Sequence, residues 1–267
     1  MSNKKNKFID AHCHLFTEYY KKEEIENIVA GINNNNIEFI INNGGSHKNN
    51  LECIDLALKY HFIKACIGIH PESGEGENGY LQVEKLLNEH QNLIVGIGEI
   101  GLDYYYEDGL SKEKQLLSFE NQIKLANKYN LPAVIHIRDK ENVYQAYRDV
   151  YDILKKYPNL KCILHTFAGD LYWAKKFMEF KNLYFSFSGV ITFGSADKTR
   201  DVVKMLPLDR FLTETDSPYL RVHPYRNQIN EPITVVYVAY YIAGLKSIGM
   251  DKFVDRINRN LRKLFNL

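Results

Sequence analysis

Short runs of apolar residues recur along the whole chain, and stretches with mixed apolar and charged positions separate them. Each run is rich in β-branched or aromatic residues and is bounded by Gly, Pro, Asn or Asp, a pattern typical of buried β-strands. The sequence predicts strands at 8–14, 37–43, 63–70, 93–99, 132–137, 161–165, 182–189 and 210–216.

The segments between these runs have helical periodicity. In 112–129 the apolar residues Leu116, Phe119, Ile123 and Ala126 recur at the spacing of one helix face. A second helix is predicted at 141–157, and the apolar pattern after residue 235 predicts closing helices.

Strands that alternate with helices favour a parallel sheet built from βαβ units. Eight such units in 267 residues predict a single α/β domain over 1–267, a (β/α)₈ TIM barrel, with an open doubly wound sheet as the alternative.

Most of the candidate chemistry lies at the C-terminal ends of the predicted strands. The side chains concerned are His12, His14, His70, Glu99, His136, His165 and Asp216. In a barrel these ends meet on one face, where the loops build the active site. Histidines that only filled the core would have no reason to gather there.

Two histidines one residue apart on a strand point to the same side, so His12 and His14 can bind one ion together. Four imidazoles and two carboxylates in one cavity would be costly to bury without cations between them. We therefore predict a metal centre made by His12, His14, Glu99, His136, His165 and Asp216. Six ligands exceed the needs of one tetrahedral zinc, so two divalent ions are expected, with Glu99 as the bridge. Zn, Mn, Mg and Fe all remain open.

Neighbouring residues admit two interpretations each. Arg138 shares the face of His136, where it can meet a phosphate or form an ion pair with a nearby acid. His70 can contact substrate or be structural. Tyr104–Tyr106 can stack on bases or simply pack on a surface loop. Asp10 and Glu214, each two residues before a predicted ligand, are expected to orient ligands.

Composition and charge narrow the function further. The net charge of +1 excludes a global basic surface for coating DNA or anionic membranes. The four cysteines form no close pair and the N-terminus lacks an apolar leader, so we expect buried thiols in a cytoplasmic protein. No membrane contact and no obligate protein partner is expected. The asparagine runs at 33–36 and 42–50 are interpreted as loop or compositional bias.

Seven motifs occur in order along the chain: DAHCHL (10–15), GIHP (68–71), GEIGLDYY (98–105), HIRD (136–139), HTFAG (165–169), SGVITF (188–193) and ETDSPYL (214–220). Together they resemble the TatD family of metal-dependent deoxyribonucleases, within the amidohydrolase-type barrel superfamily. The resemblance implies hydrolysis of DNA phosphodiester bonds at a centre that usually holds two metal ions. It places the same six residues on the ligand positions and His70 in the substrate pocket.

For catalysis we expect a metal-activated water, with Asp216 orienting it and accepting its proton, and Glu99 bridging the ions. His70 and Arg138 are the expected substrate-binding residues. The near-neutral charge favours a nuclease that contacts few phosphates, such as an exonuclease acting on single strands or strand ends.

Three departures from the family pattern concern substrate preference. They are Phe16 where an acid is common, HTFAG in place of an HCFSG-like motif, and the glycine-free segment 226–232. Two other readings therefore stay open. One is a metal-dependent ester hydrolase, such as a D-aminoacyl-tRNA deacylase or a lactonase. The other is a non-catalytic, metal-binding interaction module.

Overall fold

The computed structural model describes residues 7–76, 78–106 and 109–267, except for the side chain of Asn33. Residues 1–6, where a leader would begin, lie outside these ranges. The described chain forms one sheet in which every strand pairs in parallel with the next. Its strands are β1 Phe8–Cys13, β2 Ile37–Asn43, β3 Ile63–Ile67, β4 Ile94–Asp103, β5 Ala133–Arg138, β6 Cys162–Leu164, β7 Leu183–Phe187 and β8 Phe211–Thr213.

Contacts between the first and last strands close the sheet into a barrel. The backbone N–H of His14 donates to the carbonyl oxygen of Ser217 at 2.7 Å, and the backbone N–H of Asp216 donates to the carbonyl oxygen of His12 at 2.9 Å. The predicted (β/α)₈ barrel is therefore confirmed, and it places the two ends of the chain's motif series side by side.

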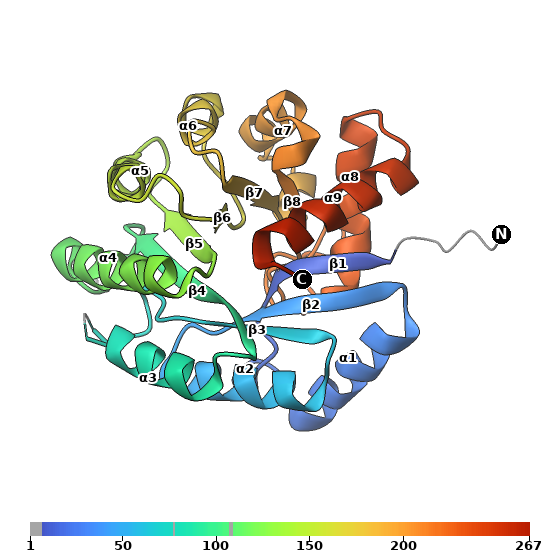
Figure 1. The fold of residues 1–267 in the computed structure, drawn as a ribbon. Helices are drawn as coiled ribbons and strands as arrows, with labels where there is room; N and C mark the ends of the chain where they lie inside the picture. The colour runs from blue at the N-terminus through green and yellow to red at the C-terminus, as the bar shows by residue number, and fades with distance from the viewer. Residues whose placement is uncertain (1–6, 77, 107–108) are drawn as a thin grey trace.

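Helices surround the strands, as Figure 1 shows. They are α1 Lys22–Asn34, α2 His47–Lys59, α3 Tyr80–His90, α4 Lys112–Tyr129, α5 Gln145–Lys155, α6 Leu171–Phe177, α7 Asp197–Met205, α8 Val235–Leu245 and α9 Met250–Phe265, with short 3₁₀ turns at Gly189–Thr192, Leu208–Arg210 and Pro232–Thr234. The stripe predicted on α4 faces inward, with Phe119, Ile123 and Ala126 fully buried.

In the described ranges no single helix is long and apolar enough to cross a bilayer. By length and composition alone, one pair of segments passes that test together, Pro232–Leu245 with Met250–Phe265, and it is bent by 114°.

Several predicted strand ends are wrong, and three of the errors affect the site. β8 ends at Thr213, so Asp216 lies on the segment that follows the strand. β4 continues past Glu99 as far as Asp103, because it pairs with β5 up to the partners Asp103 and Arg138. β3 stops at Ile67, because the next two residues bond to side-chain amides instead of a strand. Glu99 therefore lies inside a strand, and His70 lies on a loop.

The long fourth strand depends on a glycine. Gly101 has a φ of +146°, and a Cβ there would overlap the carbonyl oxygen of His136 on β5. Only glycine adopts such a backbone conformation readily. This close approach sets the separation of the two strands that carry Glu99 and His136.

Gly101→Ala is predicted to lower the free energy of unfolding of the metal-free protein by at least about 2 kcal/mol, from backbone strain and steric overlap. Gly244→Ala is the matched control, because Gly244 lies in α8 with open space around it. That change should be neutral or stabilising by up to about 1 kcal/mol. Urea unfolding measures both, and equal effects of the two substitutions would contradict this interpretation of Gly101.

Candidate metal centre

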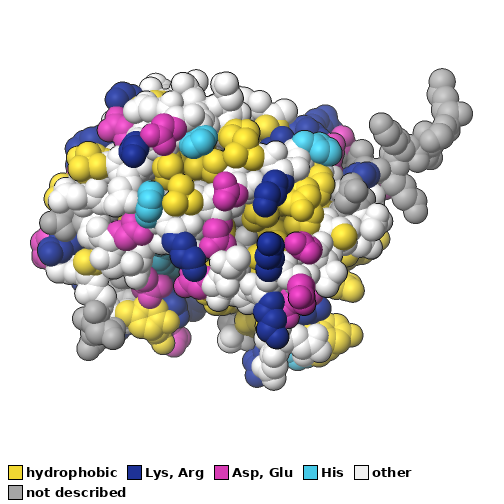
Figure 2. Space-filling model, turned by 90° about the horizontal axis from the view of Figure 1, so that it is seen from below, with side chains coloured by type: hydrophobic (Ala, Val, Ile, Leu, Met, Phe, Trp, Pro, Cys, Tyr) yellow, Lys and Arg dark blue, Asp and Glu magenta, His cyan; other side chains and the backbone are white. Residues whose placement is uncertain are grey.

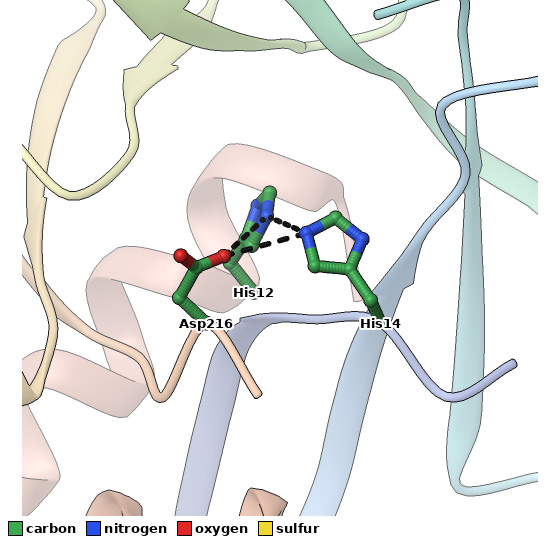
Figure 3. A group of neighbouring side chains, drawn as sticks. All are labelled: His12, His14 and Asp216. Carbon is green, nitrogen blue, oxygen red and sulfur yellow. Dashed lines mark hydrogen bonds and ion pairs between the residues drawn. The ribbon is translucent and has the colours of Figure 1, made fainter. Parts of the chain in front are cut away.

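Two histidines of β1 and an aspartate after β8 form the first half of the site. His12 and His14 project to the same side, and their rings point toward Asp216 (Figure 3). The Nε2 atoms of the two rings lie 3.0 Å apart. Oδ1 of Asp216 is 3.4 Å from Nε2 of His12 and 3.3 Å from Nε2 of His14. Its other oxygen, Oδ2, takes part in neither contact.

Glu99 supplies a fourth atom to this group. Its Oε2 lies 3.3 Å from Nε2 of His12 and 3.2 Å from Nε2 of His14. Zinc–ligand distances of about 2.0–2.2 Å require tetrahedral ligands to stand roughly 3.3–3.6 Å apart. The distances within this group, 3.0–3.4 Å, fit one small divalent ion among the four atoms.

The second oxygen of Glu99 faces a second group. Its Oε1 lies 3.0 Å from Nδ1 of His136 and 2.7 Å from Nε2 of His165, and those two nitrogens are 3.2 Å apart. This is a second cluster of donor atoms, in which each distance is shorter than the spacing around a zinc ion and the side chains would move slightly apart to admit one. One carboxylate connects both clusters. The structure thus brings together the six predicted ligands; their role as ligands remains a prediction.

Hydrogen bonds on the far side of two rings fix which nitrogen is free to bind a metal. Nδ1 of His14 lies 2.8 Å from the carbonyl oxygen of Asn43, which only accepts, so Nδ1 carries the proton. Nε2 of His136 lies 2.9 Å from Oδ2 of Asp103 and donates in the same way. When it is neutral, each ring is left with an unprotonated nitrogen facing Glu99, the form that a metal ligand requires.

His70 is arranged differently, although its distance alone would group it with Glu99 and His136. Its Nδ1 accepts from the backbone N–H of Glu72 at 3.2 Å, so the neutral ring carries its proton on Nε2. That Nε2 lies 3.4 Å from Oε1 of Glu99. In this tautomer His70 presents a donor to the site, not the lone pair that a metal ligand needs.

Charges in the site shift the pKa values of its members when metal is absent. Burial lowers the pKa of His14, but hydrogen bonds to Asp216 and Glu99 outweigh burial and raise it to about 10. Burial raises the pKa of Glu99, but the charges of His165, His70 and His12 hold it well below its usual range. The histidine protons thus compensate the buried carboxylates until metal ions replace them.

The centre opens into a cavity of about 820 Å³ on the face where the strands end. Arg138 lines this cavity together with His70, so the structure places both predicted substrate residues beside the centre. Arg138 stacks over the ring of Tyr105 at 4.1 Å, and its Nη1 lies 3.3 Å from the hydroxyl of Tyr106. No ion pair between Arg138 and an acid is found in the described residues.

Several supporting residues escaped sequence analysis. Asp103 behind His136 was not singled out, although its motif GLDYY was quoted. Gln115 and Gln122 of α4 are buried and form paired bonds to the backbones of Asp103 and Ile69. The sequence does contain a signal for the two glutamines: Gln115 and Gln122 stand seven residues apart on the helix face that is otherwise apolar.

The interpretation of the asparagine run at 42–50 is wrong. Asn42 and Asn43 end β2, and Asn49 and Asn50 lie in the first turn of α2, all of them buried. Asn50 bonds to both the N–H and the carbonyl oxygen of Gly68, two residues before His70. Buried side-chain amides of this kind supply hydrogen bonds to backbone N–H and C=O groups that have no strand partner where the sheet ends.

Asp10 is buried but does not contact a ligand ring, so it does not orient one in the way the sequence predicted. Its Oδ1 accepts from the backbone N–H groups of His12 and Thr215, and its Oδ2 accepts from the hydroxyl of Thr215. It therefore connects β1 to the segment after β8. Tyr104 is also buried, and its hydroxyl donates to Asp149, whereas Tyr105 and Tyr106 are exposed.

Comparison with known proteins agrees with this geometry. The family model described as "TatD related DNase" matches residues 9–266. The uncharacterized metal-dependent hydrolase YabD of Bacillus subtilis is 37% identical, over 97% of this chain and 98% of its own. An uncharacterized metal-dependent hydrolase of Buchnera aphidicola is 34% identical, over 97% and 99%. The solved structure of YjjV, a TatD homolog from Escherichia coli, is 28% identical with a TM-score of 0.88, over 97% and 98%.

Metal binding at pH 7 is predicted to release at least one proton per chain, because metal-free His14 has a raised pKa of about 10 and must lose its proton to become a ligand. Because this proton competes with the metal for His14, the apparent metal affinity rises with pH. The contribution of His14 to that rise ends at about pH 10, where its pKa lies. Zinc titrations by calorimetry, in buffers with different ionisation enthalpies, measure the protons released. Binding heats that do not depend on the buffer would contradict the prediction.

Proposed function

The chain belongs to the TatD-related DNase family of metal-dependent hydrolases, and we propose that it hydrolyses phosphodiester bonds of DNA. We further propose an exonuclease that acts on single strands or strand ends, with two divalent ions as cofactors. The observation that carries the proposal is Glu99, whose two oxygens each face a separate cluster of donor atoms. Phosphodiester cleavage is chemistry to which such a pair of ions is well suited.

Ions bound there would polarise a phosphoryl group and lower the pKa of a water molecule toward neutrality. Asp216 is placed to orient that water, because Oδ1 faces the histidines while Oδ2 remains available as an acceptor. Burial alone would raise the pKa of Asp216, but hydrogen bonds to His12 and His14 and the charge of His165 hold it well below its usual range. Asp216 is therefore ionised at neutral pH, and its Oδ2 can accept a hydrogen bond from that water.

Two further side chains suit a phosphate substrate. His70 presents its Nε2 proton to the cavity side of Glu99 and can donate to a phosphate oxygen. Arg138 can hold a second oxygen with its planar fork, and stacking on Tyr105 fixes that plane in advance. The exposed rings of Tyr105 and Tyr106 lie where a nucleobase next to the bound phosphate could stack.

The charge of the cavity supports a substrate with few phosphates. Of the described residues that line it, Arg138 is the only lysine or arginine, whereas Glu18 and Glu72 add negative charge near its mouth. Positive and negative side chains are also interspersed on the face shown in Figure 2, which is seen from below Figure 1. A long duplex would meet no continuous track of cations in the cavity or on that face, while a strand end needs only one or two contacts.

We also place this reaction in the cytoplasm. The four cysteines are unpaired and buried, as the sequence predicted, which supports a reducing compartment. DNA is the only partner that the proposal requires.

The zinc- or manganese-loaded protein is predicted to shorten end-labelled single-stranded DNA stepwise, and to act faster on it than on blunt duplex. A lactone and a D-aminoacyl ester, assayed in parallel, test the ester-hydrolase alternative. Turnover of either ester with no DNA cleavage would refute the nuclease proposal. Full DNA cleavage after chelation of the metal would refute the metal mechanism.

Arg138→Lys is predicted to lower kcat/KM for DNA by roughly 10- to 100-fold, because an ammonium cannot reproduce the stacked, two-pronged contact. Arg138→Ala should in addition reduce the salt dependence by about one counterion. Arg148→Ala is the control, since Arg148 is exposed on α5 and does not line the cavity. Steady-state kinetics over a range of salt concentrations measure all three variants, and indistinguishable values would rule out phosphate binding by Arg138.

A further inference from the structure

Two of the site histidines are stacked as a pair. The rings of His12 and His165 are nearly parallel, at 13°, with centroids 4.1 Å apart. Nε2 of His12 faces Oε2 of Glu99 at 3.3 Å, and Nε2 of His165 faces Oε1 at 2.7 Å. One ring therefore belongs to each half of the centre, and Glu99 joins them at one end.

The remaining nitrogens of this pair lack hydrogen bonds. Nδ1 of His12 and Nδ1 of His165 are both buried, and neither has a hydrogen-bond partner among the described residues. A ring that binds a metal through Nε2 carries its proton on Nδ1, so each ring needs an acceptor there. A buried N–H without one costs about 1–3 kcal/mol.

Glu214 is a carboxylate that lies close to one of these two nitrogens. It is fully buried, and its Oε1 lies 3.5 Å from Nδ1 of His165 while accepting from the backbone N–H and the hydroxyl of Thr166. Its Oε2 is buried with no partner among the described residues. One carboxylate thus has one oxygen near His165 and one oxygen unused.

The position of Glu214 in the barrel brings it near His12 as well, without a direct contact between the two side chains. Glu214 follows β8, which neighbours β1 where the barrel closes, and Asp216 two residues later donates its N–H to the carbonyl oxygen of His12. The unused Oε2 of Glu214 and the unpartnered Nδ1 of His12 are therefore complementary groups on neighbouring segments, and each still needs a partner.

We propose that Glu214 is a positioning residue for both halves of the metal centre, and that with metal bound it accepts from Nδ1 of His165 through Oε1 and from Nδ1 of His12 through Oε2. It would thereby hold the stacked pair at the end opposite Glu99. The other hydrogen-bond acceptors behind the histidine rings each contact one ring: Asn43 accepts from His14, and Asp103 accepts from His136. The inference rests on the two-ion centre of the proposed function but not on which bond is cleaved, so its test measures metal binding and ring protonation.

Glu214→Gln separates the two roles of the carboxylate. The amide oxygen can keep the bonds to Thr166, which leaves the amide NH₂ facing the N–H of His12. We expect zinc affinity to fall roughly 10- to 100-fold in this variant. In spectra of zinc-loaded protein with ¹⁵N-labelled histidine rings, the Nδ1–H signals of His12 and His165 should both move, and those of His14 and His136 should stay.

Two controls make the result specific. Asp103→Asn should move only the His136 signal and weaken one of the two zinc equilibria. Thr166→Val removes the hydroxyl that donates to Glu214 but leaves the carboxylate in place. The zinc affinity of this variant should stay within about threefold of the parent, a much smaller loss than that expected for Glu214→Gln. If Glu214 acted only by holding Thr166, Thr166→Val would reproduce the loss seen in Glu214→Gln.

The parent protein provides a test that does not depend on whether a variant folds. In its zinc-loaded form, His12 and His165 should both carry a proton on Nδ1 that exchanges slowly with solvent. An unprotonated or rapidly exchanging Nδ1 at His12 would overturn the proposal. So would a Glu214→Gln variant in which the His12 signal does not move.

Discussion

The site depends on one buried carboxylate that is shared by histidines from opposite sides of the barrel. Glu99 is only 4% exposed, and its two oxygens contact Nε2 of His12 and His14 on one side and the rings of His136 and His165 on the other. A carboxylate so far from water is stable only with positive charge beside it. Imidazolium protons supply that charge in the absence of metal, and metal ions would supply it in the proposed two-ion centre.

This requirement explains several features of the surrounding fold. β4 must carry Glu99 deep enough to reach both groups, and it continues four residues further, to Asp103, whose carboxylate orients His136. Gly101 lets β4 and β5 approach closely between these two points. The same strand therefore supplies the carboxylate that both groups of histidines share and the acceptor that fixes the tautomer of His136.

Much of this architecture was predictable from residue patterns. The apolar runs located all eight strands, because buried parallel strands are uniformly apolar and the polar residues that end them stand out. The spacing of His12 and His14 and the positions of His136, His165 and Asp216 then followed from strand geometry. The relationship to a hydrolase family was equally visible in the ordered motifs.

What could not be predicted is how buried polar groups find partners across distant segments. Asp103 and Gln115 meet through a strand extension that only the pairing with β5 reveals. Asn50 looked like part of a biased tract, yet it holds the loop before His70. Such contacts depend on three-dimensional complementarity. The repeat of Gln115 and Gln122 within an apolar stripe marks two buried polar positions, but it does not say which distant backbone they bind.

Anomalous X-ray diffraction from crystals of the zinc-loaded protein tests the central claim most directly. The account predicts two metal peaks per chain, with one oxygen of Glu99 on each, His12, His14 and Asp216 around the first and His136 and His165 around the second. A single fully occupied peak, or two peaks without Glu99 between them, would contradict it.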